Sequence, residues 1–127
     1  MSHDIHHKHL IKELREQLAP LFEQSPQAIY LYLDDAHKIC SQKFADLLEY
    51  GSVEEWVANE HPVGDVDEAD RDKVIDAYAE ASGDLRASTL PAIWVTKKGK
   101  KVKTEVTMVP LPYRNEIFVL HFIVVKK

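Results

Sequence analysis

Histidines near the N-terminus are the first residues in this chain whose type and spacing could do chemistry. His3, His6, His7 and His9 cluster within the first nine residues. His3 and His7 would share one face of a helix that began this early, at a spacing that can hold a transition metal. No carboxylate or thiol of fixed position completes a site, so we expect a frayed polar tail without a metal.

Other motifs that could carry chemistry are incomplete. The single cysteine, Cys40, excludes an internal disulfide framework and a cysteine-built zinc site, and its place on a predicted strand favours a buried structural thiol. The acidic segment 60–72 lacks the order of a calcium loop, because Gly64 precedes its acids. The sequence has no nucleophile elbow, phosphate loop or zinc-hydrolase motif. We therefore expect no enzymatic activity.

Size and charge narrow the class of protein further. The chain has 127 residues and a net charge of −5, which fits one globular domain. The lysines of 97–103 gather on a predicted hairpin without interleaved aromatic residues, a pattern that does not favour nucleic acid but could dock an acidic partner. No apolar run reaches the roughly 20 residues that span a bilayer, and the polar start is not a signal peptide. These features predict a cytoplasmic protein that binds neither membrane nor nucleic acid.

The first structural element is an amphipathic helix over about 7–24. Its apolar seam follows a 3-4-3 spacing and consists of Ile11, Leu14, Leu18 and Leu21. Ser25 and Pro26 end the helix. The seam could lie on the helix's own domain alone, or it could also contribute to a dimer contact.

The middle of the chain alternates short strands and helices. The predicted elements are a strand over 28–33, a short paired strand over 38–40, a helix over 42–49, a helix that starts just before Trp56, and a helix over 70–81. Ser41 is the expected N-cap of the 42–49 helix, and Ser52 begins a capping box. Gly83 is expected to close the last helix.

Three strands complete the fold, over 85–96, 102–109 and 117–125. The turns between them lie at 97–100 and 114–115, and Pro110 and Pro112 are expected to end the middle strand. The final strand is apolar on both faces and must be covered on both. We therefore predict an α+β fold, with a five-stranded antiparallel sheet, short helices on one face, and the N-terminal helix or a partner subunit on the other.

Four segments, in this order and spacing, resemble a PAS (Per-Arnt-Sim) domain over about residues 18–125. They are Ser25–Tyr30, Cys40–Tyr50, His61-Pro62 with the later Asp70-Arg71, and Lys97–Val102. The chain departs from the family pattern at Ser41, where asparagine is usual, at Glu49, where glycine is usual, and at an insertion over 63–69. The resemblance divides the chain into a dimerisation helix with its His-rich tail, 1–24, and a PAS-like domain, 25–127.

The resemblance implies a non-enzymatic sensory or interaction module, which dimerises, can bind a small ligand in its core, and acts in trans on an effector protein. Relatives that react covalently with flavin have a cysteine in the region of 52–66, and haem-binding relatives have a histidine on the long helix. This sequence has neither, which argues against both cofactors and leaves any other cofactor unknown.

The resemblance also implies which side chains face the family's pocket. The candidates are Tyr30, Tyr32, Trp94, Thr104, Met108, Leu120 and Phe122. The aromatic residues among them could orient a ligand or simply fill the core. The same strand phase puts Val119, His121 and Ile123 on the outer face, where they join the helix seam as dimer-interface candidates.

Two alternatives remain open from the sequence. One is a closed core with a purely structural role in protein interaction. The other is a small enzyme of cone-shaped, ketosteroid-isomerase-like architecture, which needs an Asp or His that points into a cavity. His121 is predicted to point outward, which disfavours the enzyme.

Overall fold

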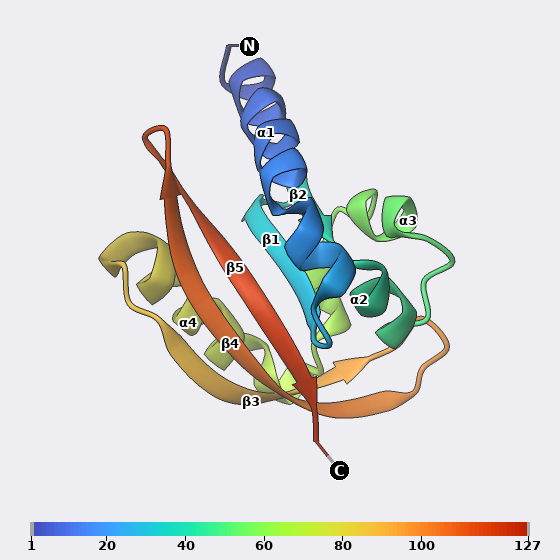
Figure 1. Cartoon of the computed structure of the whole chain (residues 1–127). Coiled ribbons are helices and arrows are strands. Elements are labelled where there is room, and N and C mark those ends of the chain that lie inside the picture. The colour runs from blue at the N-terminus through green and yellow to red at the C-terminus, as the bar shows by residue number, and fades with distance from the viewer. Residues whose placement is uncertain (1, 127) are drawn as a thin grey trace.

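A five-stranded antiparallel sheet organises the molecule (Figure 1). The structure is a computed structural model that describes residues 2–126, with side chains from residue 5 onward. The strands lie in the order β2-β1-β5-β4-β3. Their bounds are β1 Ala28–Asp34, β2 His37–Cys40, β3 Ser88–Val95, β4 Lys101–Tyr113 and β5 Glu116–Val125.

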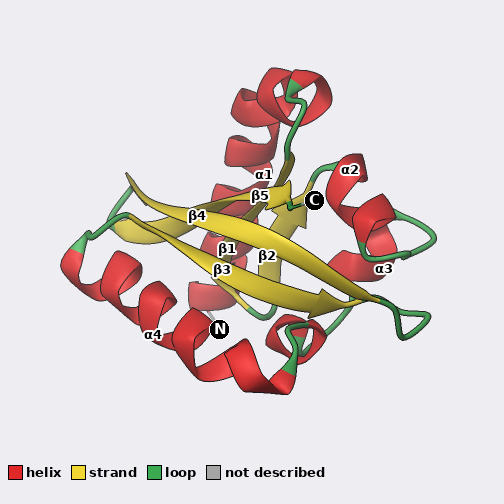
Figure 2. Cartoon of the chain, turned by 90° about the horizontal axis from the view of Figure 1, so that it is seen from below, coloured by secondary structure: helices red, strands yellow, loops and turns green. Residues whose placement is uncertain are grey.

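Helices cover both faces of this sheet (Figure 2). The outer face carries α1 (Ser2–Gln24), and the inner face carries α2 (Gln42–Leu47), α3 (Val53–Val57), the 3-10 helix η1 (Pro62–Asp65) and α4 (Glu68–Asp84). Each face has its own apolar core. The predicted α+β architecture is therefore confirmed, with the N-terminal helix on one face and the short helices on the other.

The N-terminal helix packs its apolar seam on the sheet of its own chain. Leu10 and Leu14 are buried against Ile29, Leu31 and Phe118 in the outer core. The hydroxyl of Tyr113 donates to Glu13 over 2.9 Å and so ties α1 to the end of β4. The helix is longer than predicted and includes the histidine-rich segment, so the expected frayed tail is wrong for His6, His7 and His9. The side chain of His3 lies outside the described residues.

The short inner helices begin where the sequence predicts. The Oγ of Ser41 accepts hydrogen bonds from the amides of Phe44 and Ile29, and the Oγ of Ser52 accepts one from Glu55. Such caps satisfy amides that have no partner within the helix.

The long helix α4 does not end where the sequence predicts. Gly83 lies within it, and Leu85 provides the left-handed cap residue, with φ of 54°. The buried Ala81, which is packed in the inner core, explains why tertiary contacts carry the helix past the glycine.

The β4–β5 hairpin also extends further than predicted. Pro110 and Pro112 were expected to end the strand, but both lie within β4 and are paired with β5. Prolines are tolerated here because β3 pairs with β4 only as far as Met108, so this part of β4 is a sheet edge. The predicted turn at Arg114 and Asn115 is confirmed, with φ of 48° and 71°.

The phase of β5 is opposite to the one expected from the sequence. Tyr30 pairs with His121, Tyr32 with Val119 and Ala28 with Ile123, and residues directly opposite each other share a face. Val119, His121 and Ile123 therefore lie on the inner face, whereas Leu120 and Phe122 face α1. The prediction failed because an apolar strand contains no alternation that could fix its phase, and a shift of one residue exchanges the faces.

Candidate functional site

A cavity of about 240 Å³ lies between the inner face of the sheet and the helices α3, η1 and α4. It is partly open to solvent and smaller than most drug-binding clefts, which favours a small ligand. Most of its lining is aromatic or aliphatic. The lining residues are Tyr30, Tyr32, Asp35, Trp56, Pro62, Val63, Val66, Val74, Ile75, Tyr78, Trp94 and His121.

Tyr30 lies at the centre of an aromatic cluster in the cavity wall. Its ring stacks on His121 with centroids 3.9 Å apart and planes 11° apart. The rings of Phe44, Trp56 and Trp94 surround it at centroid distances of 4.8, 5.3 and 6.2 Å. Burial raises the pKa of the Tyr30 hydroxyl, which therefore keeps its proton.

His121 is a neutral part of this wall. Burial lowers its pKa to about 3, against hydrogen bonds to the backbone that act in the opposite direction. Its Nδ1 lies 3.1 Å from the carbonyl oxygen of Val119, which places the ring proton on that nitrogen. The imidazole thus provides an aromatic surface without charge near neutral pH.

The rim of the cavity contains two tyrosines and one carboxylate. The rings of Tyr32 and Tyr78 meet edge to face with centroids 5.1 Å apart. The hydroxyl of Tyr32 donates to Asp35, and that of Tyr78 donates to the carbonyl of Leu33 over 2.9 Å. Burial is the main cause that raises the pKa of both tyrosines. Among the lining residues given above, Asp35 brings a negative charge and no lysine or arginine balances it.

Two indole N–H groups of the wall have no hydrogen-bond partner within residues 5–126. They belong to Trp56 and Trp94, whose rings line the cavity. Buried donors without partners are rare in folded proteins, and each costs about 1–3 kcal/mol. Small movements of these rings would let an acceptor atom in the cavity satisfy them.

A buried lysine lies close to one of these indoles, and the sequence did not indicate it. The Nζ of Lys38 is 5.4 Å from the ring centroid of Trp56 and donates to the carbonyl of Val57 over 2.8 Å. Burial lowers the pKa of Lys38, and the carboxylates of Asp35 and Asp34 act against that shift. The lysine fastens α3 to β2 and supports the indole from outside the cavity.

The pocket candidates from the sequence fall into three groups. Tyr30, Tyr32 and Trp94 line the cavity. Thr104 and Met108 are buried on the inner side of β4 but are not among its lining residues, and Thr104 donates to the carbonyl of Ala92 over 2.8 Å. Leu120 and Phe122 lie on the opposite face, in the outer core.

The sequence did not indicate the residues of loops and helices that line the cavity. Asp35, Trp56 and Tyr78 are the polar members of that group. His121 was singled out by the sequence but placed on the outer face. A histidine within an otherwise apolar strand needs a specific environment, and here the aromatic wall of the cavity supplies it.

The seam residues of α1 are engaged within the chain. Leu14 is buried in the outer core, and Ile11, Leu18 and Leu21 pack against that core while staying half-buried. Only the half-buried residues keep surface for another molecule without movement of the helix.

Cys40 is buried, as predicted, and burial raises its pKa to about 12, which makes it an inert structural thiol.

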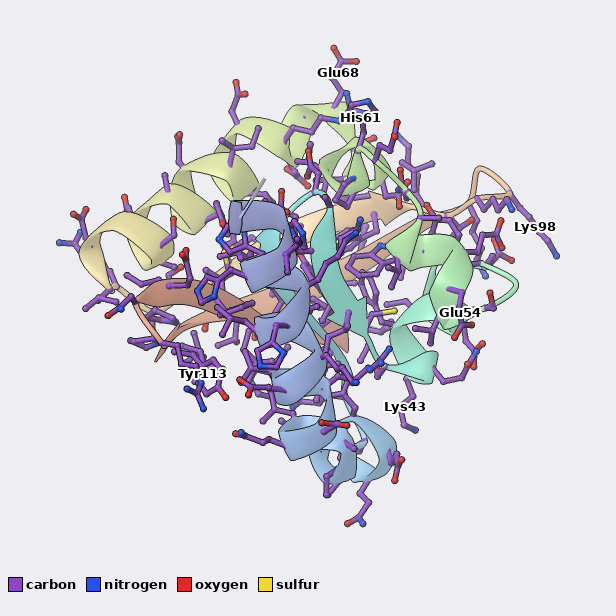
Figure 3. All side chains as sticks on the ribbon, turned by 90° about the horizontal axis from the view of Figure 1, so that it is seen from above. Lys43, Glu54, His61, Glu68, Lys98 and Tyr113 are labelled. Atoms are coloured by element: carbon purple, nitrogen blue, oxygen red, sulfur yellow. The ribbon has the colours of Figure 1, made fainter. Side chains whose placement is uncertain are left out.

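The basic hairpin is partly neutralised within the chain, because Lys97 pairs with Glu55, and Lys101 pairs with Asp67 over 3.2 Å. Lys98 extends from the tip of this hairpin (Figure 3). No helix in the described part of the chain is long and apolar enough to cross a membrane.

Comparisons with known proteins identify the fold. A PAS domain of a two-component sensor histidine kinase is 18% identical, with a TM-score of 0.68 over 91% of this chain and 99% of that one. A PAS domain from Colwellia psychrerythraea is 19% identical, with a TM-score of 0.71 over 89% and 97%. The PAS domain of an HTR-like protein from Haloarcula marismortui is 21% identical, with a TM-score of 0.66 over 94% and 97%. No protein-family model and no curated protein sequence matches the chain. The chain therefore has the PAS fold, as its sequence motifs predicted.

Proposed function

We propose that this chain is a sensory or signalling module of the PAS type, without enzymatic activity, that binds a small aromatic ligand in the cavity beneath α4. The observation that carries the proposal is the pair of unpartnered indole N–H groups of Trp56 and Trp94 in an aromatic wall. A filled core would bury these polar groups against partners. The fold, and its likeness to a PAS domain of a two-component sensor histidine kinase, support the same function.

The lining predicts the charge of the ligand. Asp35 is negative, His121 stays neutral, and none of the lining residues is a lysine or arginine that could pair with an anion. Aromatic faces attract cations and stack on neutral rings. The ligand is therefore a neutral or cationic aromatic molecule.

The enzymatic alternative has to be weighed again, because His121 faces the cavity and not the outer side. Its depressed pKa and its stacking on Tyr30 suit a wall residue better than a general base at neutral pH. Asp35, the carboxylate of the rim, accepts the Tyr32 hydroxyl and is held at the surface. A binding function accounts for both residues without a reaction.

The signal would pass to another molecule in trans. We propose a homodimer that uses the half-buried side of α1, and an effector protein in the cytoplasm as the recipient. The position of Ile11 supports a dimer contact on α1, because Ile11 lies in a surface groove between α1 and α3 that Phe22 and Val57 also line. The dimer seam proposed here is smaller than the sequence predicted, because Val119, His121 and Ile123 face inward.

A set of three related probes tests the ligand site by isothermal titration calorimetry. Indole is neutral, tryptamine is cationic and indole-3-acetate is anionic. We expect indole and tryptamine to bind, and indole-3-acetate to bind at least about tenfold more weakly beside Asp35. Val74→Phe should abolish binding by filling the cavity, and Ala79→Leu on the exposed side of α4 should leave it unchanged.

Three results would count against this proposal. No binding of indole or tryptamine at millimolar concentration would indicate a closed core. Equal binding by the Val74→Phe and wild-type proteins would place the probe elsewhere. Preference for the anionic probe would refute the charge argument based on Asp35.

A further inference from the structure

A second group of polar side chains lies outside the cavity, where the first turns of α1 cross the β1–β2 turn. It consists of His7 from α1, Asp34 at the end of β1 and His37 at the start of β2. One potential ligand atom from each residue lies within 4.8 Å of the others. His37 is buried and the side chain of His7 is 17% exposed, whereas Asp34 is open to solvent on one side.

The distances within this cluster fit two imidazoles that share one carboxylate. His37 Nδ1 lies 2.7 Å from Asp34 Oδ1, and His7 Nδ1 lies 3.7 Å from Asp34 Oδ2. The two rings meet nearly at right angles with centroids 5.3 Å apart. In a tetrahedral zinc site with bonds of about 2.0–2.2 Å, neighbouring ligand atoms are about 3.3 Å apart. Side-chain adjustments of an ångström or so therefore bring the three donors to coordination distance.

A fourth residue, Glu116, contacts the imidazole of His7 at its other ring nitrogen. The Nε2 of His7 lies 3.2 Å from Oε2 of Glu116, the first residue of β5. The contact lacks hydrogen-bond geometry, and a small rotation of the His7 ring would let Nε2 donate to Glu116 and leave the Nδ1 lone pair directed at the Asp34 side. Histidine ligands of metals commonly donate their other ring N–H to a carboxylate, which fixes the tautomer and the ring orientation.

We propose that His7, Asp34 and His37 bind a divalent transition metal, with zinc as the best fit, and that Glu116 is the positioning residue for His7. Two imidazoles and one carboxylate are a donor set that suits zinc, and they leave a fourth position for water. The sequence argued against a metal because no carboxylate of fixed position accompanied the histidines. The fold supplies that carboxylate from the β1–β2 turn, together with a second histidine.

A bound ion would link α1 to the outer face of the sheet. The three ligands come from α1 and from both strands of the first hairpin, so a bound ion holds the N-terminal half of α1 against the sheet. Because metal that binds the folded state alone adds to its stability, zinc should raise the melting temperature.

Calorimetry with zinc chloride on the chelator-treated full chain tests the site. We expect one zinc ion per chain. His37→Gln and Asp34→Asn should each lower the affinity at least about 100-fold, and Glu116→Gln should lower it about 10–100-fold through His7. His9→Gln is the matched control, because His9 belongs to the same histidine-rich segment but is 66% exposed and faces Glu13.

Cobalt provides a readout that a purely structural role would not change. Wild-type protein loaded with Co²⁺ should show the visible absorption of a four-coordinate site, and Asp34→Asn should lose it while keeping its far-UV circular dichroism. Loss of zinc in His9→Gln with retention in His37→Gln and Asp34→Asn would assign binding to the tail and overturn the proposal. Absence of one-to-one zinc binding by the wild-type chain would overturn it as well.

Discussion

The pH dependence of folding offers a direct test of the position of His121 in the inner core. The substitution His121→Phe keeps an aromatic ring against Tyr30 and removes the titrating nitrogen atoms. Because His121 is fully buried and stacked at 3.9 Å, its protonated form has little access to solvent in the folded state. The folded pKa of about 3 lies well below the ordinary value of 6.5.

The sign and the size of the effect follow from linkage. Between pH 6.5 and 3 the unfolded chain binds a proton at His121 that the folded chain excludes, so the free energy of unfolding falls as the pH falls. The full stability is present above pH 6.5 or so. From pH 7 to pH 5 this one group removes about 2 kcal/mol, a value set by the unfolded pKa alone as long as the folded pKa stays below about 4.

Urea unfolding at pH 7 and pH 5 measures this difference. The wild-type protein should lose about 2 kcal/mol more than His121→Phe over that interval. His61→Gln is the control, since His61 is exposed and its variant should keep the wild-type pH dependence. Equal losses in the wild-type and His121→Phe proteins would show that His121 reaches solvent or a negative charge, and would refute the burial argument.

Two further predictions concern a cap and the helix surface. Ser41→Ala should lower the free energy of unfolding by about 1–2 kcal/mol in urea titrations, because its Oγ accepts hydrogen bonds from two buried amides. A loss below that of Ser25→Ala, whose Oγ accepts one solvent-exposed hydrogen bond, would contradict this role. Ile11→Arg should convert a wild-type dimer into a monomer in sedimentation velocity, whereas Glu16→Arg on the exposed side should not, and a wild-type monomer at all concentrations would contradict the proposed dimer.

Features that depend on neighbouring residues were predictable from the sequence. Ser41 and Ser52 cap their helices because a hydroxyl can satisfy free amides three residues ahead, wherever the helix packs. Gly99 has φ of 88°, and the tight turn it allows was evident from its place among lysines between two strands. These local signals, taken in order, were sufficient to identify the fold.

The composition of the cavity could not be predicted in the same way. The phase of β5 depends on its pairing with β1, and a strand that is apolar at Val119, Leu120 and Ile123 alike gives no local preference for either register. The prediction from the sequence therefore assigned the residues of β5 to the wrong faces of the sheet. Lining residues such as Tyr78 reach the cavity from a distant helix, so only the tertiary packing reveals them.

The histidine cluster shows a different limit. His7 and His37 carry no common sequence motif, because metal sites in loops and helix ends are recognised by spacing only when their ligands lie in one segment. Here the ligands come from three elements, α1, β1 and β2, that meet in the folded chain. The tail alone pointed to His3 and His7, whereas the cluster in the folded chain combines His7 with Asp34 and His37.

The β1–β2 turn connects the two proposed sites. Asp34 contacts His7 and His37 on the α1 side, and the next residue, Asp35, accepts the Tyr32 hydroxyl at the rim of the cavity. Asp34 and Asp35 share one planar peptide unit, so a movement of the Asp35 backbone is passed to Asp34. A ligand that displaces the Tyr32 hydroxyl from Asp35 therefore acts on the carboxylate that holds the start of α1. Under the two proposals, this turn lies between the cavity and the helix that faces a partner.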